Sequence, residues 1–181
     1  MIIFEGPDGS GKSYLVQYLL EKAPDSFSLF PTQGPPKSRA DLLCRMDSVL
    51  DLQQPGKETL VDRFALFSEQ VYGPIVRDGC LLSDEDIQSF TGRLLKEDPL
   101  IVFCRPSIKT ITGHLITAKA HKLPDHVEKV QAQRLRLIYQ YDRVMMRMVR
   151  SGLNILWFNR DTMPTEELHD VWISPMYRKK P

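Results

Sequence analysis

The feature that most constrains the fold is a glycine-rich segment near the start of the chain, Gly6–Ser13. It follows a short apolar run, Ile2–Glu5, and it opens a segment with helical patterning at Lys12. Its sequence, GPDGSGKS, matches the pattern G-x-x-x-x-G-K-[ST] at every required position. A strand, a glycine loop and a helix in this order predict an α/β fold, the P-loop NTPase fold.

The residue types of this loop suit a phosphate chain. Glycines let the backbone curl into a nest of N–H donors, and the helix N-terminus adds partial positive charge. Lys12 is expected to reach the β- and γ-phosphates of a nucleotide, and the Ser13 hydroxyl to bind magnesium. We therefore predict ATP and Mg²⁺ as cofactors, with ATP bound along Asp8, Gly9, Ser10, Gly11, Lys12, Ser13 and Tyr14.

Short apolar runs alternate with longer helical patterns along the rest of the chain, which is typical of a parallel sheet with helices on both faces. We predict a five-stranded parallel sheet in a single domain over residues 1–181. The strands are expected at Ile2–Glu5, Phe27–Phe30, Thr59–Asp62, Leu100–Cys104 and Asn154–Phe158. Helices are expected from Lys12, at Ser38–Leu50, as a pair within Ala65–Lys96, and at Val127–Arg150.

The longest predicted helix has one apolar face, which a single arginine, Arg134, interrupts. Its apolar residues recur at helical spacings and are Val127, Val130, Leu137, Tyr141, Val144 and Met148. An inward arginine favours an anionic partner, because burying the charge alone is costly. An arginine that reaches solvent from the edge of the face fits the pattern as well.

Composition and charge argue against several classes of protein. The chain is 42% hydrophobic and 26% charged, as ordinary globular domains are. Its net charge of +1 gives no field that favours nucleic acid or an anionic membrane. No apolar run reaches membrane-spanning length, and three widely spaced cysteines form no disulfide framework or zinc motif. We expect a cytoplasmic protein that binds small nucleotides, with no nucleic-acid or membrane partner.

A second motif, Asp62-Arg63-Phe64, ends the third predicted strand. Ligands in such sheets collect at the carboxyl ends of the strands, so Asp62 is placed to contact magnesium and Arg63 to hold a phosphate. Further along, Tyr72 is a candidate for stacking on a base and Arg77 for holding a phosphate. A place in the core or on a helix surface explains these two residues equally well.

Together the two motifs resemble the thymidylate kinase family of P-loop kinases, particularly its divergent bacteriophage members. The matching segments are Phe4–Ser13, then Asp62-Arg63-Phe64, a following serine, and Tyr72-Gly73. The resemblance implies transfer of the ATP γ-phosphoryl group to the 5′-phosphate of a deoxynucleotide, dTMP or a related one. It also implies a homodimer, and a host cytoplasm if a phage encodes the chain.

The resemblance assigns roles to individual residues. Asp8 is expected near the 3′-hydroxyl of the acceptor sugar, Arg63 at the acceptor phosphate, Asp62 near magnesium, and Tyr72 near the acceptor base. Two departures stand out. Ser68 and Tyr72 lie one residue further from Asp62-Arg63 than in typical members, and Pro31–Pro36 replaces an arginine-containing turn.

The catalytic cation is the missing part of the pattern. Phosphoryl transfer in this family uses an extra cation from the P-loop or from a lid. Gly9 stands where some relatives carry a P-loop arginine, and the expected lid at about 114–127 contains no arginine. Arg105, after the fourth strand, and Arg134 are the candidates for this role.

Three functions remain open from the sequence. The leading hypothesis is a nucleoside monophosphate kinase with Lys12, Asp62 and Arg63 at its catalytic centre. A deoxynucleoside kinase would instead use Glu5 or Asp62 as base toward a 5′-hydroxyl. A nucleotide-binding regulatory protein with little catalysis is the third, favoured by the depleted lid.

Overall fold

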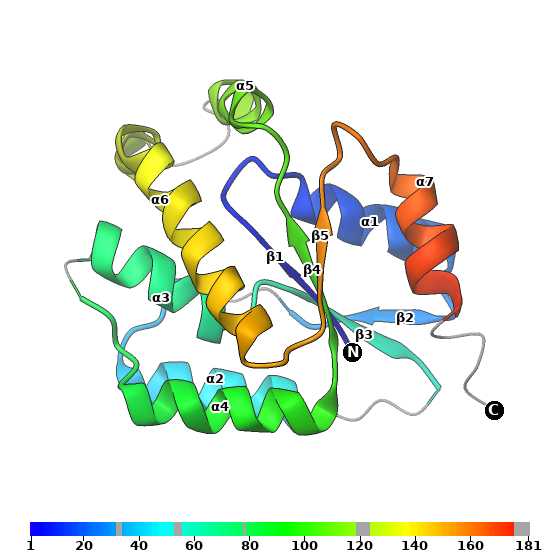
Figure 1. Cartoon of the computed structure of the whole chain (residues 1–181), viewed down its shortest axis with the longest axis horizontal. Coiled ribbons are helices and arrows are strands. Elements are labelled where there is room, and N and C mark those ends of the chain that lie inside the picture. The colour runs from blue at the N-terminus through cyan, green and yellow to red at the C-terminus, as the bar shows by residue number, and fades with distance from the viewer. Residues whose placement is uncertain (32–33, 53–55, 78, 119–123, 176–181) are drawn as a thin grey trace.

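Five parallel strands form one sheet in the computed structural model, in the order β2-β3-β1-β4-β5 (Figure 1). The model describes residues 1–31, 34–52, 56–77, 79–118 and 124–175, with the side chains of 118 and 124–131 left out. The strands are β1 (Ile2–Glu5), β2 (Phe27–Leu29), β3 (Glu58–Asp62), β4 (Leu100–Cys104) and β5 (Ile155–Phe158). The predicted fold class is confirmed, and each predicted strand end is within one residue of the observed one.

The helices that were predicted are present, and two segments add helices that were not. The helices are α1 (Lys12–Lys22), α2 (Arg39–Leu50), α3 (Ala65–Val76), α4 (Asp84–Glu97), α5 (Ile108–Ala118), α6 (Pro124–Arg150) and α7 (Thr165–Glu167), which continues into a π-helical turn, η2 (Leu168–Ile173). Helix α5 and the C-terminal helices were missed. The first part of the expected lid belongs to α5, and residues 119–123 lie outside the described chain.

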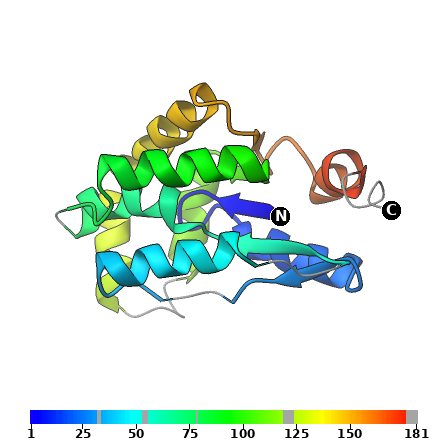
Figure 2. The same ribbon diagram turned by 90° about the horizontal axis from the view of Figure 1, so that it is seen from below.

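Alternate residues of the strands pack against two different groups of helices. Ile2 and Phe4 contact the layer made by α1 and the C-terminal helices. Ile3 of the same strand, with Val61 and Ile101 of its neighbours, packs on the layer made by α2 to α6. Figure 2 shows the α2–α6 group and the C-terminal helices on separate sides of the molecule. A sheet buried on both faces explains why its strands are apolar runs without alternation.

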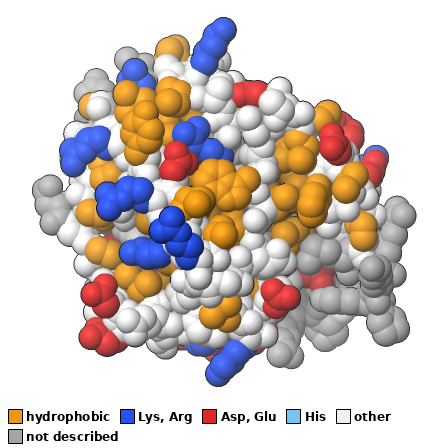
Figure 3. All heavy atoms as spheres, in the orientation of Figure 1, with side chains coloured by type: hydrophobic (Ala, Val, Ile, Leu, Met, Phe, Trp, Pro, Cys, Tyr) orange, Lys and Arg blue, Asp and Glu red, His pale blue; other side chains and the backbone are white. Residues whose placement is uncertain are grey.

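The apolar face of α6 is confirmed where its side chains are described. Leu137, Tyr141, Val144 and Met148 are buried, whereas Val127 and Val130 lie outside the described side chains. On the opposite side of α6, apolar side chains reach the surface, and on the face of Figure 3 they lie between Lys and Arg. Within the described part of the chain, no helix is long and apolar enough to cross a membrane.

Candidate functional site

The glycine loop connects β1 to α1 at the carboxyl edge of the sheet. Gly6, Gly9 and Gly11 have φ angles of +141°, +80° and +91°, a region that other residues rarely adopt. At Gly6 a Cβ atom would also lie 2.3 Å from the carbonyl oxygen of Cys104, on the neighbouring strand. The glycines are therefore required both by the turn and by the close passage of β4.

Lys12 is folded over its own loop. Its Nζ donates to the carbonyl oxygens of Gly6 at 2.8 Å and Pro7 at 2.9 Å. Burial, together with the nearby Arg63 charge, lowers the pKa of Lys12 to about 8, against Asp8 and Asp62, which raise it. An anion in the loop would therefore meet an ammonium group with little water around it, where charge interactions are strong.

Ser13 and Asp62 face each other across the end of the sheet. The Ser13 hydroxyl donates to Asp62 Oδ2 at 2.7 Å, because parallel pairing of β1 with β3 sets Phe4 beside Asp62. A hydroxyl and a carboxylate are ligands that Mg²⁺ prefers, usually completed by water and phosphate oxygens. The described residues contain no group of three or more His, Cys, Asp or Glu that could hold a metal alone. The pair thus fits a magnesium ion that nucleotide phosphates help to bind.

Arg63 is the centre of a half-buried cluster. Its Nη1 donates to the Tyr141 hydroxyl at 2.6 Å and to the Gly6 carbonyl at 3.2 Å, and its Nη2 pairs with Asp8. Nη2 also lies 3.3 Å from the Tyr72 hydroxyl, and the guanidinium lies over that ring. Arg63 has φ +75°, so its backbone is held in a conformation that costs most residues about 1–2 kcal/mol. The structure thus brings together three predicted residues, Asp8, Arg63 and Tyr72.

Glu5 is fully buried and faces backbone amides. Its carboxylate accepts from Phe64 N at 2.6 Å and Gly6 N at 3.3 Å. Burial raises the pKa of Glu5 to about 7, although Arg63 and Lys12 lower it. Glu5 therefore ties the end of β1 to the start of α3.

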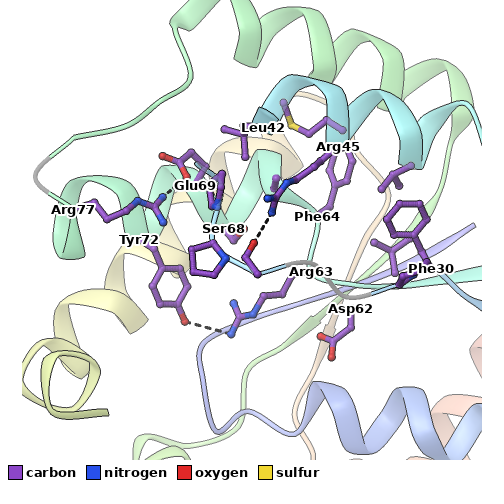
Figure 4. A pocket seen from close by; sticks show the side chains of 18 of the residues that line it. Phe30, Leu42, Arg45, Asp62, Arg63, Phe64, Ser68, Glu69, Tyr72 and Arg77 are labelled. Carbon is purple, nitrogen blue, oxygen red and sulfur yellow. Dashed lines mark hydrogen bonds and ion pairs between the residues drawn. The ribbon is translucent and has the colours of Figure 1, made fainter. Parts of the chain in front are cut away.

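A pocket of about 410 Å³ opens beside this cluster. Its walls are α2, α3 and the turn after β2, and Asp8, Asp62 and Arg63 line the end next to the glycine loop. Arg77 lies at the far end, paired with the buried carboxylate of Glu69 (Figure 4). Pockets of this size hold small ligands, so the site joins a phosphate loop to a chamber for a second molecule.

The proline-rich turn that replaces the expected arginine turn is held by an arginine from α2. Arg45 donates to the Gly34 carbonyl and pairs with Asp41, one helical turn before it (Figure 4). It lines the pocket, although the sequence reasoning did not select it. A basic residue in the second turn of a helix carries no signal of this role by itself.

The two candidates for the missing cation have different environments. Arg105 donates to both carboxylate oxygens of Asp142, from Nε at 2.8 Å and from Nη2 at 3.0 Å. The Arg105 guanidinium thus binds a carboxylate on α6 and does not point to the glycine loop. Arg134 is half-buried on α6.

Two residues that touch the glycine loop were not predicted. The guanidinium of Arg160, in the loop after β5, lies over the Tyr14 ring and so close to Gly11 that a Cβ there would be 2.7 Å from Nη1. His114 of α5 lies with Nδ1 2.8 Å from the Gly9 carbonyl oxygen. A position just beyond the fifth strand was a usable signal for Arg160, since ligands gather at the carboxyl ends of strands.

Solved structures share this fold at low sequence identity. The YorR protein from Bacillus subtilis, in complex with phosphorylated GDP, matches with TM-score 0.67 and 17% identity over 97% of this chain and 94% of that one. Deoxyadenosine kinase from M. mycoides with bound dATP gives 0.56 and 14% over 93% and 95%.

Polyphosphate Kinase 2 from Arthrobacter aurescens TC1 gives a TM-score of 0.61 and 15% identity, over 87% of this chain and 59% of that one. No protein-family model and no curated protein sequence matches the chain. Identities this low show the fold and no finer property. The chain therefore has the α/β fold that P-loop nucleotide kinases share.

Proposed function

We propose that this protein transfers the γ-phosphoryl group of ATP, with magnesium, to a deoxynucleoside monophosphate such as dTMP. The observation that carries the proposal is the shared wall between the glycine loop and the pocket. Asp62 lines the pocket and also accepts the Ser13 hydroxyl, and Asp8 belongs to the loop and also pairs with Arg63 in the pocket. A donor and an acceptor bound to these two sites would meet end to end.

The donor side follows from the loop. Lys12 would release the Gly6 and Pro7 carbonyls and turn to the β- and γ-phosphates, and Ser13 and Asp62 would hold magnesium. A magnesium ion held by Ser13 and Asp62 would supply positive charge against the phosphates. Arg160, beside Gly11 and over Tyr14, would lie against the nucleoside part of ATP.

The acceptor side follows from the pocket. Arg63 lines the end of the pocket nearest the glycine loop, and its planar guanidinium suits the phosphate of the acceptor. Tyr72 would lie near the nucleobase of the acceptor. Arg77 lines the opposite end, where it pairs with Glu69, and it stays a proposed phosphate-binding residue. A phosphate-binding residue at the loop end favours a monophosphate acceptor over a nucleoside.

The transfer itself needs positioning and charge neutralisation and no covalent intermediate. Arg105 and Arg134 remain the proposed extra cations, and Arg105 would have to leave Asp142 to act. We further propose that residues 1–181 act as one domain, that about 114–127 closes as a lid, and that the enzyme works in the cytoplasm, with a homodimer as its expected assembly.

A deoxynucleoside kinase is the second candidate because Asp62 lines the pocket at the loop end, where a 5′-hydroxyl would lie. The test is ADP release with ATP and magnesium against a panel of nucleosides and nucleoside monophosphates. Turnover only with monophosphates supports the proposal and identifies which nucleobase the acceptor carries. Turnover only with nucleosides makes Glu5 or Asp62 the candidate general base and removes Arg63 from phosphate binding.

The matched control for this assay is Lys12→Ala, which removes the ammonium group from the loop. We expect turnover to fall at least a hundred-fold, since charge-stabilising groups contribute on that order. Unchanged turnover would refute the donor site. ATP binding by the wild type without turnover on any acceptor would favour a regulatory nucleotide-binding protein.

A further inference from the structure

Helix α5 touches the glycine loop through one directed contact. His114 Nδ1 lies 2.8 Å from the carbonyl oxygen of Gly9, and the imidazole is half-buried. A carbonyl oxygen only accepts hydrogen bonds, so Nδ1 must carry the proton. The contact therefore fixes which ring nitrogen donates, whether or not the other nitrogen is protonated.

At Gly9 the backbones of the glycine loop and of α5 also approach each other closely. Gly9 has φ +80°, and a Cβ on it would lie 2.8 Å from the Ile111 carbonyl oxygen and 3.2 Å from Leu115 Cγ. Helix α5 thus occupies the space that a side chain at position 9 would need. An arginine at position 9 would therefore clash with α5.

Helix α5 is also held at its N-terminus, so it cannot simply move together with the glycine loop. Asp161, next to Arg160, accepts from Ser107 N at 2.7 Å and from the Thr110 hydroxyl at 2.8 Å. The first turn of α5 is thereby tied to the loop after β5. Helix α5, which contacts the glycine loop through His114, is therefore tied to the segment that contacts the same loop through Arg160.

The geometry of the peptide bond transmits the His114 contact to the neighbouring amide. In a planar trans peptide the carbonyl and the following N–H point in opposite directions. With the Gly9 carbonyl held toward α5, the Ser10 N–H points away from the helix, and it donates to Pro7 O at 3.2 Å. The ammonium of Lys12 donates to the same oxygen at 2.9 Å. The Ser10 N–H and the Lys12 ammonium, two donors that the loop would offer to a phosphate, therefore both donate to the Pro7 carbonyl oxygen.

We propose that His114 is a positioning residue of the phosphate loop, which holds the Gly9 carbonyl and thereby aims the Ser10 N–H at the donor phosphate. It rests on the proposed function only in taking ATP as the ligand of the loop. His114 acts through the Gly9–Ser10 peptide and not on the transferred group. Its removal should weaken ATP binding and leave the acceptor untouched.

Three variants separate this role from a general effect of the side chain. His114→Asn keeps a donor at the position of Nδ1, His114→Gln moves the donor to the position of Nε2, and His114→Ala removes it. We expect ATP affinity, measured by titration calorimetry with magnesium, to stay within about twofold for Asn. It should fall about fivefold for Gln and Ala, the value of one neutral hydrogen bond. In turnover assays the KM for ATP should follow and the KM for the acceptor should not.

Lys109→Ala is the matched control, because it removes a charge from an exposed position of the same helix and should bind ATP as the wild type does. Thermal melts without nucleotide check that each variant is folded. Wild-type ATP affinity in His114→Ala, or equal losses in the Asn and Ala variants, would overturn the inference. Because the readout is binding, ATP binding without turnover refutes the proposed transfer alone, whereas no ATP binding by the wild type refutes both.

Discussion

Tyr141→Phe removes a single oxygen from the centre of the Arg63 cluster. Tyr141 is fully buried on α6, and its hydroxyl accepts from Arg63 Nη1 at 2.6 Å. The aromatic ring stays, so no cavity opens, and the change isolates one hydrogen bond to a charged donor. Such bonds contribute about 1.5–3 kcal/mol. Because Nη1 keeps a second acceptor, Gly6 O at 3.2 Å, we expect a loss of about 2 kcal/mol in the free energy of unfolding, within the lower part of that range.

Guanidinium denaturation measures this loss as a lower midpoint at an unchanged slope. In a thermal melt it corresponds to a fall of roughly 4–8 °C for a chain of this size. The matched control lies two residues before it on the same helix. Tyr139 is 57% exposed, so Tyr139→Phe should change stability by less than about 0.5 kcal/mol.

Steady-state kinetics of Tyr141→Phe test whether Arg63 acts on the acceptor or on ATP. Without the Tyr141 hydroxyl the Arg63 guanidinium is less constrained. The KM for the acceptor should therefore rise up to about tenfold, the equivalent of 1.4 kcal/mol. The KM for ATP should not change. If Tyr141→Phe is as stable as Tyr139→Phe, the argued contribution of the Arg63–Tyr141 hydrogen bond is refuted. If the KM for ATP rises in place of the acceptor KM, the assignment of this cluster to the acceptor is refuted.

Two further predictions concern Glu5 and Gly9, and the first is a pH dependence of stability. The pKa of Glu5 is raised from 4.5 to about 7 by burial, so the folded chain keeps a proton that the unfolded chain releases. The free energy of unfolding should therefore fall by roughly 3 kcal/mol as pH rises from 4.5 to 7, and Glu5→Gln should lack this component; equal slopes in denaturant midpoints from pH 5 to 8 would contradict it. Gly9→Ala should displace α5 and weaken ATP binding, since its Cβ would lie 2.8 Å from a backbone oxygen at φ +80°. Gly113→Ala, on the same helix with open space around it, should retain wild-type ATP affinity in calorimetry, and equal losses in both variants would show that steric contact is not the cause.

The parts of the structure that the sequence predicts are those in which local pattern and burial agree. The strands were found to within a residue because a sheet covered on both faces requires continuous apolar runs. The glycine loop was found because its φ angles require glycine and its chemistry requires Lys12 and Ser13. Asp62 follows from these, since a carboxylate at the end of a neighbouring strand lies at the same edge.

The remaining parts depend on packing between distant segments. Helix α5 was missed because threonine, isoleucine and glycine in Ile108–Ala118 are weak helix formers. Its last residues, from His114, fall in the lid that the resemblance implied. Tyr141 was correctly placed on the apolar face of α6, but its hydroxyl meets Arg63 only through the packing of α6 on α3. Arg105 was expected to serve the reaction, yet its partner Asp142 lies on a helix whose position the sequence does not specify.

The position of β1 in the sheet has a consequence for how the chain is made. The strand lies in the middle, where Ile2 pairs with Leu60 on one side and with Leu100 on the other. During synthesis both partners leave the ribosome long after β1, and β5 completes the sheet later still. Non-local pairing of this kind folds slowly, because long loops must close first. The apolar residues of β1 therefore lack one of their two neighbouring strands until β4 has been synthesised, and aggregation or chaperone capture competes with folding in that interval.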